Sequence, residues 1–179
     1  GFYAFGEVVI DEMSSVRMSN SISGWGGGCH TDGRLQVTNS SVLSLQNVTT
    51  GSNGGGFVAQ REVEIAGNST VNISNSHAES GKGGGFVGQD VKVSSGSRLI
   101  LWNATAGQSG GGFVAHGRTL IISMSTVSIQ HATSRQYGGA GGGFYAGDDV
   151  VIDEMSCVRI SHSRSKGNGG GLATEKWLQ

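Results

Sequence analysis

The sequence predicts an all-β protein, a three-sided parallel β-solenoid of about six coils with about 28 residues in each coil. Three observations predict this fold. A Gly-Gly-Gly triplet, followed in most copies by Phe, returns about every 27 to 31 residues, and each interval holds three short apolar pairs in period-two alternation. The chain also has 33 glycines and no proline. A fixed period of this kind is typical of stacked solenoids, and the lack of proline suits central strands, in which every amide donates to a neighbour.

The first apolar pair of each unit begins directly after the glycines, at Phe2, Cys29, Phe57, Phe86, Phe113, Phe144 and Leu172. The second and third pairs follow in every unit, and in the fifth unit we assign the second pair to Leu120 and Ile122. Period-two alternation predicts half-buried strands. Stacking coil on coil then buries one continuous aliphatic column, and no segment keeps the period of a helix.

A polar residue stands two positions after each third pair, at Asn20, Asn47, Asn75, Asn103, His131 and His162. Asparagine tolerates the left-handed conformation, and its amide can bond the coils above and below. We therefore expect a ladder of side chains at this turn. The glycine triplet marks the next corner, where the backbone needs positive φ or close packing. The longest unit is expected to place its extra residues there, around residues 137–141.

We interpret residues 1–179 as a single solenoid domain, and because residues 1–18 closely resemble 143–160, as part of a longer repeat array. The net charge of −1 creates no broad field toward nucleic acid or an anionic membrane. No apolar run approaches the roughly 18 residues of a membrane span. Cys29 and Cys157 lie about four repeats apart, roughly 19 Å by strand spacing, which is beyond the reach of a disulfide.

The pattern Gly-Gly-Gly-Phe-Val-Ala, followed by Val-x-Ile and then Val-x-Ile-x-Asn, resembles the right-handed parallel β-helices of the pectate-lyase-like superfamily. It is most similar to the glycine-rich repeats of polymorphic outer-membrane autotransporter passengers and to long repeat proteins of unicellular algae. The resemblance covers essentially the whole chain, and it implies right-handed winding. Such relatives range from surface adhesins to polysaccharide lyases, so the resemblance leaves the function open.

The residue before the second pair forms a charged column of Glu7, Arg34, Glu62, Asp90, Thr119 (after Arg118) and Asp149. Adjacent members should lie about 5 Å apart. As a catalytic site, Glu62 and Asp90 would be an acid–base pair flanked by Arg34 and Arg118. As a structural feature, the column largely alternates in sign, which relieves like-charge repulsion along a stack. We favour the structural interpretation.

Two further features of the sequence contain residues that can bind metals. Asp11–Glu12 and Asp153–Glu154 are copies of one acidic turn, but no adjacent coil repeats the acids that calcium would require. His131 and His162 occupy the ladder position on consecutive coils, yet zinc needs further ligands that the sequence does not place beside them. We therefore expect no metal and no other cofactor.

Five Asn-x-Ser/Thr sequons are glycosylation candidates, at Asn39, Asn47, Asn68, Asn72 and Asn103. Their mild excess points to an extracellular, cell-surface or lumenal protein. Glycans on Asn47 or Asn103 would compete with ladder bonding. Trp102 beside Ile100 gives the best candidate for an apolar contact with a partner.

Regular repeats without a convergent polar site predict a structural or adhesive segment of a surface-associated protein or larger assembly, rather than an enzyme. The expected partners are other protein subunits or cell-surface glycans, with no nucleic acid and no direct membrane span. The alternative is a polysaccharide-binding or polysaccharide-cleaving protein that uses the charged column.

Overall fold

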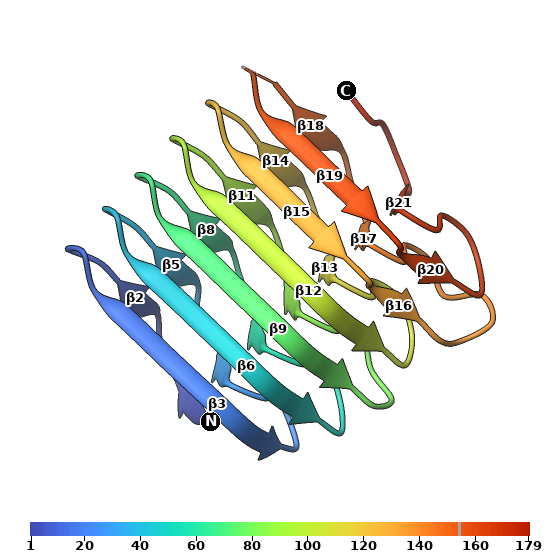
Figure 1. Ribbon diagram of the computed structural model, residues 1–179, viewed down its shortest axis with the longest axis horizontal. Coiled ribbons are helices and arrows are strands. Elements are labelled where there is room, and N and C mark those ends of the chain that lie inside the picture. The colour runs from blue at the N-terminus through green and yellow to red at the C-terminus, as the bar shows by residue number, and fades with distance from the viewer. Residues whose placement is uncertain (154) are drawn as a thin grey trace.

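The computed structural model describes residues 1–153 and 155–179, and within them it contains strands and no helix. Three parallel sheets run the length of the molecule, and each full coil contributes one strand, or one broken strand, to each sheet. The long strands of the third sheet form the front layer in Figure 1, with short strands behind them. The predicted all-β parallel solenoid of about six coils, with about 28 residues in each, is therefore confirmed.

The first sheet contains β1 (Phe2–Ala4), β4 (Cys29–Thr31), β7 (Phe57–Ala59), β10 (Phe86–Gly88), β13 (Phe113–Ala115), β17 (Phe144–Ala146) and β21 (Leu172–Thr174). The second contains β2 (Val8–Ile10), β5 (Leu35–Val37), β8 (Val63–Ile65), β11 (Val91–Val93), β14 (Thr119–Ile121) and β18 (Val150–Ile152). The third contains β3 (Ser15–Ser23), β6 (Val42–Thr50), β9 (Thr70–Ala78), β12 (Arg98–Ala106), β15 (Thr126–Gln130), β16 (Thr133–Ser134), β19 (Cys157–Ser161) and β20 (Arg164–Ser165).

In-register pairing places equivalent residues of successive coils above one another. A column of phenylalanines shows this most clearly. Phe57, Phe86, Phe113 and Phe144 are fully buried and stack nearly parallel, with ring centroids 4.6, 4.9 and 4.5 Å apart. Aliphatic side chains from all three sheets pack against this stack in one continuous core. The stacked rings therefore join consecutive coils along the axis of the solenoid.

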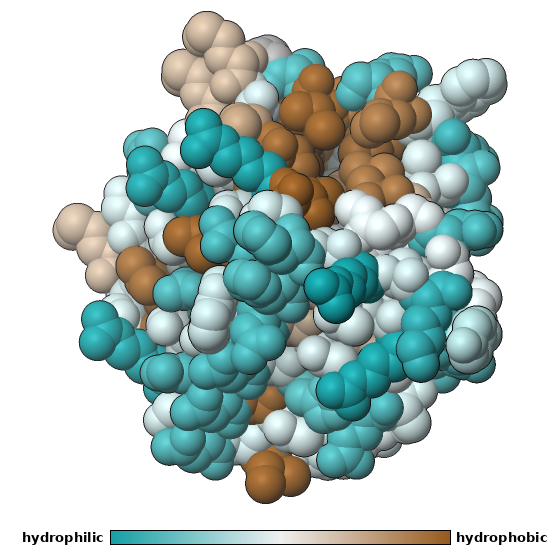
Figure 2. All heavy atoms as spheres, turned by 45° about the vertical axis from the view of Figure 1, so that its right-hand side comes forward, coloured by the Kyte–Doolittle hydropathy of each residue, from teal (hydrophilic) through white to brown (hydrophobic). Residues whose placement is uncertain are grey.

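The core continues into the last coil. Val158, Ile160 and Leu172 are half-buried and pack against it. Figure 2 brings the C-terminal side forward and shows apolar side chains gathered in its upper part, with polar side chains over most of the rest.

The glycine triplet forms the corner before the first sheet, as expected. Gly54 has φ +65°, a conformation that favours glycine. A Cβ on Gly55 would overlap the carbonyl oxygen of Gly84 in the next coil. The triplet therefore provides both a left-handed turn and close stacking of backbones.

In the first four coils the third strand is longer than the sequence predicts, because it continues past the ladder residue. In β9, Val71 and Ile73 are buried before Asn75, and Ser76 and Ala78 are buried after it. Asn75 has φ 50°, and this left-handed residue shifts the inward positions by one. The strand therefore bends around the core at the asparagine while keeping its pairing with both neighbours.

In the fifth coil, the assignment of Leu120 and Ile122 as the inward pair is wrong. Thr119 and Ile121 are fully buried, and Thr119 pairs with Val91 of the preceding coil. Backbone pairing with both neighbouring coils fixes the register of the whole strand. Thr119 therefore occupies the inward position, although its neighbour Leu120 is aliphatic.

The extra residues of the longest unit form a surface loop at the expected corner. Ala106 pairs with Ser134, whereas Phe113 pairs with Phe144, so the additional residues lie between Ser134 and Phe144. Tyr137 in this loop is largely exposed, and the ammonium of Lys166 lies 5.3 Å from the centre of its ring.

Candidate functional site

The charged column predicted from the sequence lies where the chain enters the second sheet, and it consists of Glu7, Arg34, Glu62, Asp90, Arg118 and Asp149. The backbone N–H of Val63 donates to the carbonyl of Asp90, and that of Val91 donates to the carbonyl of Arg118. Arg118, rather than Thr119, therefore occupies the fifth position, as the corrected register requires. The structure brings all four proposed catalytic residues onto consecutive coils of one edge.

Contacts between coils occupy four of the charged groups in this column. Arg34 Nε lies 3.0 Å from Glu7 Oε1, so this arginine pairs away from Glu62. Asp90 Oδ1 accepts the backbone N–H of Arg118 at 2.8 Å. Asp149 repeats this contact, because its Oδ1 accepts a backbone N–H of the next coil at 3.3 Å. These two carboxylates therefore cap backbone N–H groups of the following coil.

A shallow depression of about 360 Å³ lies beside the middle of the column, and Glu62, Asp90, Arg118 and Asp148 line it. Asp148 Oδ1 is 3.0 Å from Lys176 Nζ, and the hydrogen bond from this ammonium holds the pKa of Asp148 below its ordinary value. The depression is open to solvent, and both Glu62 and Asp90 line it.

Glu64 joins three coils on the outer face of the second sheet. Its carboxylate accepts from Gln36 Nε2 at 2.7 Å and from Lys92 Nζ at 3.1 Å. Burial raises the pKa of Glu64, but these hydrogen bonds and the charges of Lys92 and Arg34 outweigh it and leave the pKa below its ordinary value. Ionised Glu64 therefore stabilises the stack.

The predicted side-chain ladder is confirmed. Each asparagine amide donates to the side-chain oxygen of the preceding coil, at 3.1 Å from Asn47 to Asn20, 3.0 Å from Asn75 to Asn47 and 2.8 Å from Asn103 to Asn75. All the ladder residues have φ between 50° and 55°. They therefore hold the left-handed turn and also link the coils.

The histidines continue this ladder as a stack. The rings of His131 and His162 are 4.8 Å apart with 13° between their planes, and Trp102 meets His131 edge-on at 6.3 Å. Among the described residues, no three His, Cys, Asp or Glu side chains gather as a metal site. The two imidazoles stack on each other and extend the ladder into the last two coils.

The first acidic turn is hydrogen-bonded to the next coil. Asp11 accepts the hydroxyl of Thr38 at 2.9 Å, and a backbone hydrogen bond from Glu12 is the main reason why the pKa of Asp11 is lowered. In the second copy, Glu154 lies outside the described residues.

A second ladder, which our sequence analysis missed, is made of serines two positions before each third pair. In three coils, a serine backbone N–H donates at 3.1 Å to the serine hydroxyl of the next coil: Ser14 to Ser41, Ser41 to Ser69, and Ser69 to Ser97. Ser125 bonds Ser156 in the same way. Serine stands at this position in all six units, and that repetition could have revealed the ladder.

A small aromatic cluster surrounds His30 near the first coils. His30 is 7% exposed, stacks on Tyr3 at 5.0 Å and has Trp25 at its edge. Its Nε2 lies 3.4 Å from Asp32 Oδ1, and the hydroxyl of Tyr3 donates to the same carboxylate. The pairing recurs where Tyr145 contacts Glu175, so it is a repeated contact between coils.

The sequons fall into two groups. Asn39 and Asn68 are exposed left-handed turn residues, and Asn72 is exposed on the outer face of β9. Asn47 and Asn103 use their amide nitrogens in the ladder, so a glycan there would replace a ladder donor.

The predicted contact residues both lie on the outer face of β12. Ile100 is half-buried, and Trp102 is 45% exposed.

Both cysteines are free thiols. Cys29 occupies the phenylalanine column, and its burial raises the pKa of the thiol to about 12. Among the described residues, the structure contains no long apolar helix that could cross a membrane.

No protein family, curated protein or solved structure matches this chain in sequence or structure searches.

Proposed function

We propose that this chain is a rigid structural or adhesive segment of an extracellular or surface-associated repeat protein, and that it has no catalytic role. One observation carries the proposal. At position after position, a side chain bonds or stacks on its own counterpart in the next coil, as in the phenylalanine stack and the two ladders. Such contacts strengthen a solenoid along its length and leave its outer faces free for partners.

The proposal also covers the family, the partners and the location of the protein. We place the chain among right-handed pectate-lyase-like β-helices, near the repeats of autotransporter passengers and of long algal proteins. The repeat motif and the parallel three-sheet architecture support that placement. The proposed partners are other protein subunits or cell-surface glycans, no cofactor takes part, and the exposed sequons favour an extracellular or lumenal location.

Stretching single molecules between their two ends tests the structural role. A coil of about 28 residues releases roughly 95 Å of extended chain when it detaches, because each residue spans about 3.4 Å. We expect the force trace to show steps of this length, or multiples of it, as coils detach one at a time. Extension at low force without steps would contradict the proposal.

The second candidate function is binding or cleavage of polysaccharides in the depression lined by Glu62 and Asp90. Incubation with a panel of acidic polysaccharides, followed by measurement of chain ends, tests it. Cleavage that Glu62→Gln or Asp90→Asn abolishes, and that Glu12→Gln leaves intact, would establish an enzyme. We expect no cleavage, because Asp90 already caps the next coil.

A further inference from the structure

The charges of this protein are separated between its faces, although its net charge is only −1. The described strands of the third sheet contain Arg17, Arg98, Arg159 and Arg164, with no aspartate, no glutamate and no lysine. Among the described residues, Glu64 on β8 is the one acidic side chain within a strand, and the others lie in the turns and loops that connect the strands. One face of the solenoid is therefore positive while the molecule as a whole is almost neutral.

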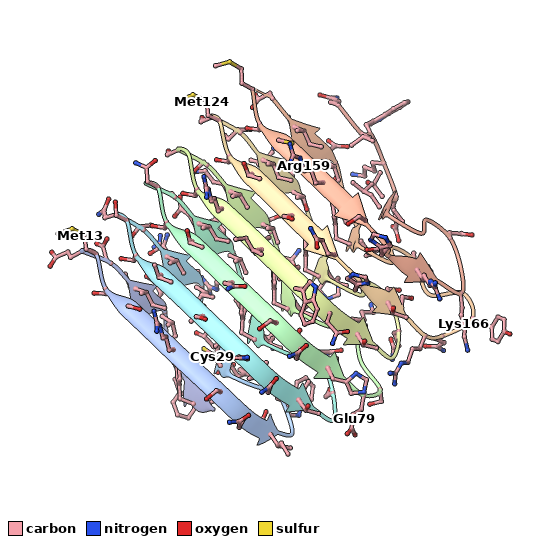
Figure 3. All side chains as sticks on the ribbon, in the orientation of Figure 1. Met13, Cys29, Glu79, Met124, Arg159 and Lys166 are labelled. Carbon is pink, nitrogen blue, oxygen red and sulfur yellow. The ribbon has the colours of Figure 1, made fainter. Side chains whose placement is uncertain are left out.

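These four arginines are available to a partner. All are exposed, and none forms an ion pair with a described residue. Figure 3 shows Arg159 on the front of β19, on the outer side of the third sheet. Register places Arg17 and Arg159 in one column, with Ile100 between them, and Arg98 in the adjacent column.

Small neutral side chains that form hydrogen bonds occupy most of the surface between the arginines. Ser44, Asn72 and Ser128 occupy three of the four positions between Arg17 and Arg159 in their column. A shallow hollow of about 370 Å³ lies near Arg17, and its lining includes Ser19, Ser44, Gln46, Thr70 and Asn72. Hydroxyl and amide groups at the regular spacing of a β-sheet can bond a row of sugar hydroxyls.

Trp102 adds an aromatic surface near the middle of this face. It follows Ile100 by two residues on β12, so both side chains point outward, and Trp102 is 45% exposed. An indole ring offers an apolar plane on which the C–H groups of a sugar ring can pack, together with an N–H that donates.

We propose that the outer face of the third sheet binds an anionic polysaccharide lying along the solenoid axis. Arg17, Arg98 and Arg159 pair with its carboxylate or sulfate groups, the serine and asparagine side chains bond its hydroxyls, and Trp102 packs on one sugar ring. The planar guanidinium fork suits bidentate bonding to such anions better than a lysine ammonium does. This inference rests on the adhesive role proposed above and specifies its ligand.

The spacing of charge favours a polysaccharide over nucleic acid. Arg17 and Arg159 are five coils apart, roughly 24 Å by strand spacing, with neutral residues and few charges between them. A DNA duplex carries one charge about every 1.7 Å, and its binding surfaces are correspondingly dense in cations. A polymer with many hydroxyls and separated anions matches this face better.

Binding measurements on the unglycosylated protein test the proposal, because a glycan on Asn72 would cover the face. The probes are heparin as a sulfated polymer, alginate as a carboxylated one, dextran as a neutral one and single-stranded DNA. We expect binding to heparin, alginate or both, none to dextran, and loss of affinity with added salt. The two anionic polymers show whether sulfate or carboxylate is preferred.

The decisive variant carries Arg17→Gln, Arg98→Gln and Arg159→Gln, and we expect it to bind about tenfold more weakly or worse. The matched control carries Arg61→Gln, Lys82→Gln and Lys176→Gln, which remove the same charge outside the strands of the third sheet, and it should bind within about twofold of the wild type. Circular dichroism checks that both variants keep the fold.

Three outcomes would overturn the inference: no binding to either anionic polysaccharide, equal losses in the two triple variants, or tighter binding of DNA through the same arginines. The stretching experiment is independent of these arginines. Failure of polysaccharide binding with stepwise unfolding intact would therefore reject the ligand and leave the structural role in place.

Discussion

Replacing Phe86 with alanine removes the ring at the centre of the phenylalanine stack. Phe86 is fully buried and lies between Phe57 at 4.6 Å and Phe113 at 4.9 Å. The substitution leaves a cavity in the core and breaks both ring contacts. It therefore tests whether the stack holds consecutive coils together.

The burial and ring contacts of Phe86 set the expected loss in the free energy of unfolding. Truncation of a buried phenylalanine to alanine lowers the free energy of unfolding by about 3–5 kcal/mol, and each ring contact is worth about 0.5–1.5 kcal/mol beyond burial. Because Phe86 has a ring on both sides, we expect a loss near the upper end, about 5 kcal/mol. Phe144 has a ring on one side only, with Leu172 on the other, so Phe144→Ala should cost about 1 kcal/mol less.

Urea unfolding followed by circular dichroism measures both losses. Phe5→Ala is the control, because this ring is 86% exposed, and we expect its effect to stay within about 0.5 kcal/mol. If Phe86→Ala costs no more than Phe5→Ala, the stacked rings do not stabilise the solenoid and the reasoning is wrong.

The remaining predictions concern the ladder, the glycine corner and the half-buried carboxylate of Glu64. Asn75→Ala should lower the free energy of unfolding by about 2 kcal/mol, because it removes two ladder bonds and puts alanine at a left-handed φ. Gly55→Ala should cost more than about 4 kcal/mol, because its Cβ meets backbone of the next coil. Both are measured by urea unfolding. The pKa of Glu64 is below its ordinary value of 4.5 in the folded state, so its stabilisation is complete above that pH and is lost as pH falls through the folded-state pKa. Glu64→Gln should therefore reduce the loss of stability in acid, as measured by urea midpoints over a pH series.

Each of these predictions has a control or a contrary result. Asn75→Gly removes the same bonds without the backbone strain, so it should be less harmful than Asn75→Ala. Gly51→Ala should be tolerated, since a Cβ there meets nothing within 4 Å. For Glu64→Gln, an acid profile as steep as that of the wild type would show that Glu64 makes no such contribution.

Much of the fold could be predicted because each repeat contains the same structural features at the same positions. The glycine corner, the inward pairs and the asparagine ladder each recur in register, so one chance match cannot produce them. The phase of β14 was harder, since Leu120, Ile121 and Ile122 give three consecutive aliphatic residues. Counting six residues from Phe113, as the third and sixth coils do from their phenylalanines, would have placed Thr119 correctly.

The charged surfaces could be predicted only in part. The column containing Glu62 and Asp90 followed from the repeat, but the ion pair of Arg34 with Glu7 and the capping role of Asp90 depend on side-chain directions. The near-zero net charge gave no indication that arginines gather on the outer face of the third sheet. It becomes visible only when Arg17 and Arg159 are placed on the same outer face as Trp102.

Distances along one outer column provide the clearest check on parallel, in-register stacking. Arg17, Ser128 and Arg159 share a column, with Ser128 four coils and Arg159 five coils from Arg17. Strand spacing gives backbone separations of about 19 Å for Arg17 with Ser128 and about 24 Å for Arg17 with Arg159. Double electron–electron resonance between spin labels at these positions should therefore give a longer label-to-label distance for the second pair. Separations that are equal, or shorter for the second pair, would rule out a stack of coils in this register.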